Sequence, residues 1–188
     1  MTIFRLPYIL AFAAASLTLV TIPVRATTDP QRQSGPDAVD LAKEVQFRLV
    51  ILSNYSVFDN LSARIEGSKV ILTGKVVHPK LKTDAEDAAK KVKGVARVQN
   101  DVELLPRLSS DDQVRRATYR AIYGDPALSR YRYSERPQIR IIVEKGIVSL
   151  EGTVYDAPDA TVAGLRAKGV PHVLAVRNNL GIQGLSAP

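Results

Sequence analysis

Hydrophobic and polar positions recur in two different periods along the first half of the chain. Between residues 41 and 52 the apolar residues lie three or four positions apart, which predicts a helix with one buried face. Over 61–65 and 70–76 they alternate with polar residues, which predicts two strands joined by a turn at 66–69. A second helical stripe covers 81–92, and a final strand runs over 95–104 with an irregularity expected near Ala96. The predicted order is helix, strand, strand, helix, strand.

The same order returns in the second half of the chain. Residues 65–76, Ile-Glu-Gly-Ser-Lys-Val-Ile-Leu-Thr-Gly-Lys-Val, correspond at a constant shift to 143–154, Val-Glu-Lys-Gly-Ile-Val-Ser-Leu-Glu-Gly-Thr-Val. About five extra residues fall within 124–130, before the first strand of the second copy. The fold prediction is therefore α+β, with two tandem αββαβ modules, each a three-stranded mixed sheet packed against two helices.

Several local features lead to more detailed expectations. Ser110 to Gln113 forms a capping-box pattern at the start of the second module's first helix, and Asp156 suits the cap of its second helix. Gly74 and Gly152 lie inside strand patterns, where glycine marks a bulge or a close approach; we expect a helix packed tightly over the strand. Asn100 and Asn178 are expected to bond to nearby backbone.

The amino terminus is typical of an export signal. Residues 1–26 combine Arg5, an apolar run from Leu6 to Val20, and small residues before a cleavage position at Ala26. The alternative is an uncleaved membrane anchor over 6–24. A polar linker is expected at 27–36, and the chain has no cysteine, so disulfides and thiolate chemistry are excluded. We expect a periplasmic protein that associates peripherally with a membrane.

Arginine and tyrosine gather in the second module. Residues 107–188 hold 12 basic and 8 acidic residues, against 11 and 10 in 37–106. Arginine binds phosphate oxygens in a bidentate manner, and tyrosine favours the boundary between acyl chains and water. The module's first helix is expected to bury Val114, Thr118, Ala121 and Ile122. The candidate lipid-binding residues are Arg115, Arg116, Tyr119, Arg120, Tyr123, Arg130, Tyr131 and Arg132.

Catalysis and metal chemistry find little support in the sequence. His78 and His172 occupy non-equivalent positions of the two copies, and neither belongs to a metal-spaced pair. The acidic residues early in each second helix are explained by the helix dipole. We expect no enzyme activity, no cofactor and no metal, and the export signal argues against a nucleic-acid partner.

The repeat resembles the BON family of bacterial envelope proteins. The resemblance rests on the Val-x-Leu-x-Gly pattern ending at Gly74 and Gly152, and on the closing Val-x-Asn ending at Asn100 and Asn178. It covers roughly 37–106 and 108–184, and the predicted domains are 37–106 and 107–184. Gly94-Val95 matches the family pattern, whereas the second copy has His172-Val173 there.

This resemblance implies a periplasmic, osmotically inducible protein that binds anionic phospholipid or supports envelope integrity under stress. Two other functions remain open from the sequence. One is a chaperone-like factor that binds other envelope proteins without any lipid role, and the other is a peptidoglycan-binding module.

Overall fold

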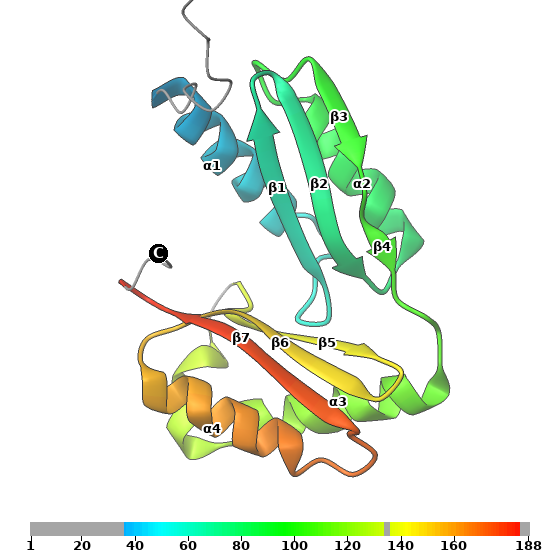
Figure 1. The fold of residues 1–188 in the computed structure, drawn as a ribbon, viewed down its shortest axis with the longest axis vertical. Coiled ribbons are helices and arrows are strands. Elements are labelled where there is room, and N and C mark those ends of the chain that lie inside the picture. Colours follow the sequence, from blue (N-terminus) through cyan, green and yellow to red (C-terminus); the bar gives the residue numbers. More distant parts are fainter. Residues whose placement is uncertain (1–35, 134–135, 185–188) are drawn as a thin grey trace, which may run out of the picture. The chain divides into compact units, whose positions relative to one another are not determined.

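The computed structural model describes residues 36–133 and 136–184 (Figure 1). The predicted signal peptide at 1–26 lies outside these residues, as does all of the predicted linker except Pro36. The fold is α+β, with two mixed sheets that are each packed against helices, as predicted. Among the described residues, no helix has both the length and the apolar character needed to cross a membrane.

The first module has two helices on one side of a mixed sheet. Strand β1 runs antiparallel to β2, whereas β3 and β4 both run parallel to β2. The extended segments occur where the alternation predicted them, and the helix α2 covers most of the predicted stripe at 81–92. The elements are α1 (Pro36–Val50), β1 (Asn60–Glu66), β2 (Lys69–Val76), α2 (Pro79–Lys90), β3 (Arg97–Asn100) and β4 (Glu103–Leu104).

The second module repeats this arrangement, with one addition. Its sheet has the order β5-β6-β7, antiparallel and then parallel, and helices α3 and α4 both contact this sheet and each other. The five extra residues expected within 124–130 form the short 3₁₀ helix η1, an element that the first module lacks. The elements are α3 (Ser109–Tyr123), η1 (Pro126–Tyr131), β5 (Ile139–Glu144), β6 (Ile147–Val154), α4 (Ala157–Lys168) and β7 (Ala175–Ile182).

Each module buries its helical stripes against one face of its sheet. In the first module Val45, Leu49, Leu72, Leu81 and Ala85 are fully buried. A fully buried side chain of this kind contributes about 1.5–3 kcal/mol relative to exposure. The matching core of the second module contains Val114, Ile122, Tyr131, Ile139, Ile141, Leu150, Ala163 and Ala167.

The strand glycines are explained by a neighbouring strand and not by a helix. Gly74 and Gly152 have φ angles of +123° and +117°, which side-chain-bearing residues rarely adopt. A Cβ atom at either position would lie 2.0 Å from a backbone oxygen, that of Asn60 or Gln138. The predicted close approach at these glycines is therefore confirmed. The prediction that a helix makes this approach is wrong, because backbone beside the strand makes it.

Asn100 and Asn178 bond to nearby backbone, as predicted. Each side-chain amide donates to a carbonyl of the helix that precedes its strand in the chain. The Asn100 amide donates to Lys82 in α2 over 2.9 Å, and the Asn178 amide donates to Ala160 in α4 over 2.7 Å. The Asn100 Oδ1 also accepts from the N–H of Val102 over 3.3 Å. This local turn divides the last strand into β3 and β4. The irregularity expected near Ala96 is present as well, because the N–H groups of Ala96 and Arg97 both donate to the carbonyl oxygen of Ser68, over 2.8 and 3.4 Å.

The start of α3 differs from the capping box that the sequence predicted. The helix begins at Ser109, its cap is Leu108, and no side chain caps it. Asp111 is instead buried, and its carboxylate accepts from the N–H groups of Lys145 and Gly146 over 2.8 and 2.9 Å. A residue inside the predicted capping pattern therefore ties α3 to the β5–β6 turn. Asp156 does cap α4 as predicted, accepting from the N–H of Asp159 over 3.0 Å.

Candidate functional site

The outer face of α3 presents three of the eight predicted lipid-binding residues together. Arg116, Tyr119 and Arg120 are exposed, and their spacing places them on neighbouring turns of the helix. Among the described residues, neither arginine forms an ion pair or a hydrogen bond. Tyr119 lies 4.9 Å from the ring of Tyr123 and is 39% exposed. These three side chains form what we call the α3 ridge.

Arg115 lies on the opposite side of α3, inside the module. It is 3% exposed, and its Nη2 donates to the carbonyl oxygen of Val143 over 2.8 Å. Its Nη1 pairs with Asp112 on the preceding turn. The buried stripe of α3 contains Arg115 where the sequence analysis had placed Ala121, which is only half-buried. Arg115 therefore belongs to the core and not to the surface.

Tyr123 and Arg132 hold the end of α3 in place. Tyr123 is buried, and its hydroxyl donates to the carbonyl oxygen of Ile139 over 2.6 Å. Burial raises the pKa of this phenol to about 12, the effect of the hydrogen bond being smaller and opposite. Arg132 is exposed, but its Nε donates to the carbonyl oxygen of Tyr123 over 2.8 Å. Its charge faces solvent while its orientation is fixed by the backbone.

Tyr131 and Arg130 bind η1 to the start of α4. Tyr131 is 1% exposed; its hydroxyl donates to Asp159 and accepts from the N–H of Tyr155 over 2.8 Å. Burial, together with the Asp159 carboxylate, raises its pKa to about 12. The Arg130 guanidinium pairs with Asp156 over 3.1 Å and with Asp159, and lies 5.2 Å from the ring centre of Tyr155. Both residues therefore have partners inside the module.

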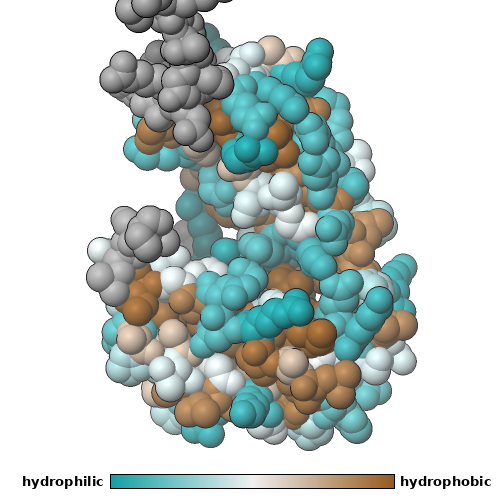
Figure 2. All heavy atoms as spheres, in the orientation of Figure 1, coloured by the Kyte–Doolittle hydropathy of each residue, from teal (hydrophilic) through white to brown (hydrophobic). Residues whose placement is uncertain are grey.

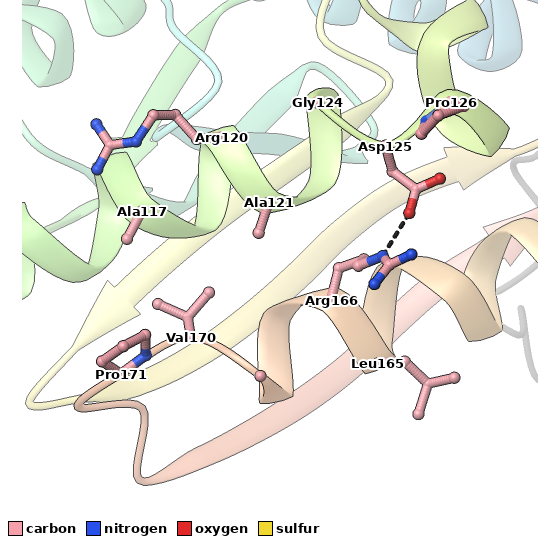
Figure 3. Close-up of a pocket in the computed structure, with 11 residues that line it drawn as sticks. Ala117, Arg120, Ala121, Gly124, Asp125, Pro126, Leu165, Arg166, Val170 and Pro171 are labelled. Atoms are coloured by element: carbon pink, nitrogen blue, oxygen red, sulfur yellow. Dashed lines mark hydrogen bonds and ion pairs between the residues drawn. The ribbon is translucent and has the colours of Figure 1, made fainter.

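A groove runs between α3 and α4 beside the α3 ridge. Its volume is about 560 Å³ (Figure 3). Ala117 and Ala121 point from α3 toward α4, and Arg166 points from α4 toward Asp125, to which its Nε donates. The α4 side includes Leu165, which is 64% exposed. The remaining lining residues are Arg120, Gly124, Pro126, Gly169, Val170 and Pro171.

The Asp125 carboxylate anchors one end of this groove. It is buried and accepts from Arg166 and from the N–H of Ala127 over 2.8 Å. These donors lower its pKa, the Arg166 guanidinium having the larger effect. Arg166 is thus charge-paired, whereas Arg120 adds a positive charge at the same groove that no described carboxylate pairs with.

The surface of the second module is mixed rather than uniformly polar. Figure 2 shows brown apolar patches between bands of hydrophilic residues on the visible face of this module. Leu165 and Leu174 are two of its exposed large apolar side chains, at 64% and 79% exposure. Within the described ranges, no group of three or more His, Cys, Asp or Glu side chains could hold a metal ion. The arrangement has the chemistry of an amphipathic binding surface.

A duplicated α+β module with an antiparallel hairpin and a parallel third strand defines the class of this protein. The sequence profile of the BON domain matches residues 37–106 and 110–184. The chain therefore belongs to the BON family and carries two tandem BON domains. Domains of this family are associated with membranes and lipids and are generally non-catalytic.

Comparison with curated proteins finds no match. Among solved structures, the C-terminal domain of CdsD, the structural protein of the Type III secretion system of Chlamydia trachomatis, is similar at 13% identity. That match covers 77% of this chain and 66% of the other, with a TM-score of 0.31. A second CdsD structure matches at 10% identity, covering 76% and 92% of the two chains, with a TM-score of 0.30.

Sequence reasoning missed the α4 side of the groove. Leu165 and Arg166 were not singled out, because neither stands out within its own segment. Superimposing the two copies reveals them: the 78-residue shift places Leu165 on Asp87 and Arg166 on Ala88. Between the two copies, an exposed acidic residue is replaced by leucine and a half-exposed alanine by arginine. Comparing the copies position by position could therefore have found Leu165 and Arg166.

Proposed function

We propose that this protein is a periplasmic, non-catalytic envelope protein whose second BON domain docks on anionic phospholipid. The observation that carries this proposal is the α3 ridge, where two exposed arginines lie beside an exposed tyrosine and no carboxylate of the described part of the chain pairs with them. Guanidinium groups suit phosphate oxygens, and a tyrosine ring suits the interface below the headgroups. The periplasmic location rests on the predicted signal peptide.

The number of available charges sets the expected strength of docking. Arg116, Arg120 and the exposed Arg132 supply three positive charges, and a basic residue near an anionic membrane contributes about 1 kcal/mol. The sum, about 3 kcal/mol before any tyrosine insertion, corresponds to binding weaker than about millimolar for one site. Docking should therefore be reversible and should weaken with salt, because exposed charges are screened over about 10 Å at 0.1 M.

Flotation with liposomes tests this proposal. The mature chain should float with vesicles that contain phosphatidylglycerol at low salt and should not float with vesicles of phosphatidylcholine alone. Arg116→Glu/Arg120→Glu should abolish flotation without changing the circular dichroism spectrum. Arg115 is left unchanged, because reversing a buried charge would disrupt the core. Equal flotation with both vesicles, or none with either, would refute lipid docking through this surface.

A matched control separates the α3 ridge from overall charge. Lys91→Glu/Lys93→Glu reverses two exposed charges in the first BON domain and changes the net charge by the same amount. This variant should still float. If it loses flotation as completely as the ridge variant does, net charge and not the α3 ridge governs binding.

A further inference from the structure

We propose that the groove between α3 and α4 binds a single acyl chain that carries one negative charge, such as a long-chain fatty acid or a lysophospholipid. This inference rests on the proposed function, since it assigns a ligand class to the same side of the second BON domain. The acyl chain would lie along the small apolar residues of the groove, and the anionic head would lie at its outer edge, between Arg166 and Arg120, whose guanidinium points away from α4 (Figure 3).

The floor of the groove is open because its residues are small. Ala117, Ala121 and Val170 present apolar atoms, and a volume of about 560 Å³ lies within the usual range of ligand sites. Gly169 is not required by its backbone: its φ is −78°, and an added Cβ would meet no atom closer than 3.7 Å. Its missing side chain therefore leaves space that the fold does not need. Gly124 differs, because a Cβ there would lie 2.3 Å from the Arg120 carbonyl oxygen.

The first BON domain offers an internal comparison for this groove. The equivalent space between α1 and α2 has a volume of about 350 Å³ and is lined in part by the carboxylates of Asp84 and Asp87. Since the two domains share one fold, most residues that differ between these grooves are not dictated by folding, Gly124 being the exception described above. The pairs are Arg48 and Ala121, Ile51 and Gly124, Asp87 and Leu165, Ala88 and Arg166, and Lys91 and Gly169.

Four of these five differences make the groove of the second domain wider or more apolar, whereas the fifth, Ala88 to Arg166, adds a long side chain that pairs with Asp125. Three long side chains become alanine or glycine, which widens the groove, and one carboxylate becomes an exposed leucine, which makes its rim apolar. The charges at the groove indicate the charge of the ligand's headgroup. Arg166 is paired with Asp125, and within residues 36–133 and 136–184 no carboxylate pairs with Arg120, so Arg120 adds a positive charge at the edge of the groove. A monoanionic carboxylate or phosphodiester complements that charge, whereas a neutral headgroup does not.

Binding of soluble monomers tests the groove separately from membrane docking. Palmitate and palmitoyl-lysophosphatidylglycerol, each below its micelle concentration, should bind the full-length mature chain saturably at one site by titration calorimetry. Palmitoyl-lysophosphatidylcholine should bind about tenfold more weakly, a difference of about 1.4 kcal/mol. If both anionic probes bind, the result supports a groove that recognises any single acyl chain carrying one negative charge. Binding of palmitate alone supports a fatty-acid site, and binding of the lysolipid alone supports a lysophospholipid site.

Two variants make the assignment specific. Ala121→Leu/Gly169→Leu fills the groove and should lower the affinity for both anionic probes about tenfold or more, while flotation with phosphatidylglycerol vesicles stays unchanged because the α3 ridge is intact. Leu165→Asp restores the acid of the first domain at an exposed position, so folding is not at risk, and should weaken binding of both probes. Ala88→Leu, in the groove of the first domain, should have no effect.

The outcomes distinguish this inference from the proposed function. If the chain floats with anionic vesicles but binds no anionic monomer, or if Leu165→Asp and the filled groove bind as the unmodified chain does, the acyl-chain site is refuted while lipid docking stands. If monomers bind but vesicles do not float, the groove stands and docking through the α3 ridge is refuted.

Discussion

The Nη2 of Arg115 donates a hydrogen bond over 2.8 Å to the carbonyl oxygen of Val143, and so joins α3 to the end of β5 from inside the second BON domain. The next residue, Arg116, points into solvent. Two adjacent arginines on one helix therefore serve opposite purposes, one in the fold and one on the candidate lipid surface.

Removing each arginine in turn should separate these purposes. Arg115→Ala should lower the free energy of unfolding by about 3 kcal/mol, because it removes a buried charge-assisted hydrogen bond and leaves the Val143 carbonyl without that partner. Arg116→Ala should change it by less than about 0.5 kcal/mol. Urea denaturation measures both. Equal stability of the two variants would contradict the core role of Arg115.

The strand glycines should tolerate no side chain. Gly152→Ala should destabilise the chain by more than about 2 kcal/mol, because its φ of +117° is strained for alanine and the new Cβ would overlap the Gln138 carbonyl oxygen. Gly169→Ala is the matched control, with an ordinary φ of −78° and room for a Cβ. It should be close to neutral in thermal unfolding. A mild effect of Gly152→Ala would show that the hairpin can shift to accept a side chain.

The buried carboxylate of Asp111 should matter more than a helix cap does. Asp111→Ala leaves the N–H groups of Lys145 and Gly146 without their acceptor, and Lys145 needs support because its φ is +52°. We expect a loss of about 2 kcal/mol, with faster hydrogen exchange confined to the β5–β6 turn. Ser110→Ala, one residue earlier and exposed, should be neutral. If both substitutions lower the free energy of unfolding equally, the loss would come from the start of α3 and not from the β5–β6 turn.

Lowering the pH should reduce the free energy of unfolding of the second domain through two carboxylates. The Arg166 guanidinium lowers the pKa of Asp125, and the N–H of Asp159 lowers that of Asp156. Because both folded-state values lie below the unfolded value near 4, their contribution to stability is complete above about pH 4 and is lost as the pH falls through the folded-state pKa. Unfolding measured from about pH 5 to pH 2 should show this decline. Asp156→Asn should flatten it, whereas Asp40→Asn on α1 should not.

Raising the pH should reduce the free energy of unfolding of the second domain through the two buried phenols. Burial raises the pKa of Tyr123 and Tyr131 to about 12, so their stabilising contribution is complete below the ordinary value near 10 and is lost as the pH rises through 12. In an absorbance titration of tyrosinate, Tyr123 and Tyr131 should therefore ionise only well above pH 10. Tyr131→Phe should remove one late-titrating group. A single transition near pH 10 for all tyrosines would refute the burial of these phenols.

The fold was largely predictable, because alternation and helical spacing act within short segments. The two hairpins, the helices and the insertion before β5 follow directly from these periods and from the repeat. The start of α3 did not, since Asp111 gains more from two N–H groups of a distant turn than from a helix cap. Such long-range acceptors have no signature in the local sequence.

The candidate site was predicted in part, for a different physical reason. Arg115, Tyr123 and Tyr131 were assigned to the surface because their tips are polar. Each has a long apolar or aromatic body that can be buried when its tip finds a partner, here Val143, Ile139 and Asp159. The groove could not be read from one segment, because it exists only where α3 and α4 meet.

The turn at Asn100 also affects how the two domains behave at high concentration. It leaves the first domain with two short strand pieces of four and two residues, a form that resists pairing with strands of another molecule. In the described part of the second domain, β7 runs uninterrupted for eight residues at the end of its sheet. Edge-to-edge aggregation through the last strand of a sheet should therefore start at β7 and not at β3 or β4, and a proline or lysine placed in β7 should suppress it.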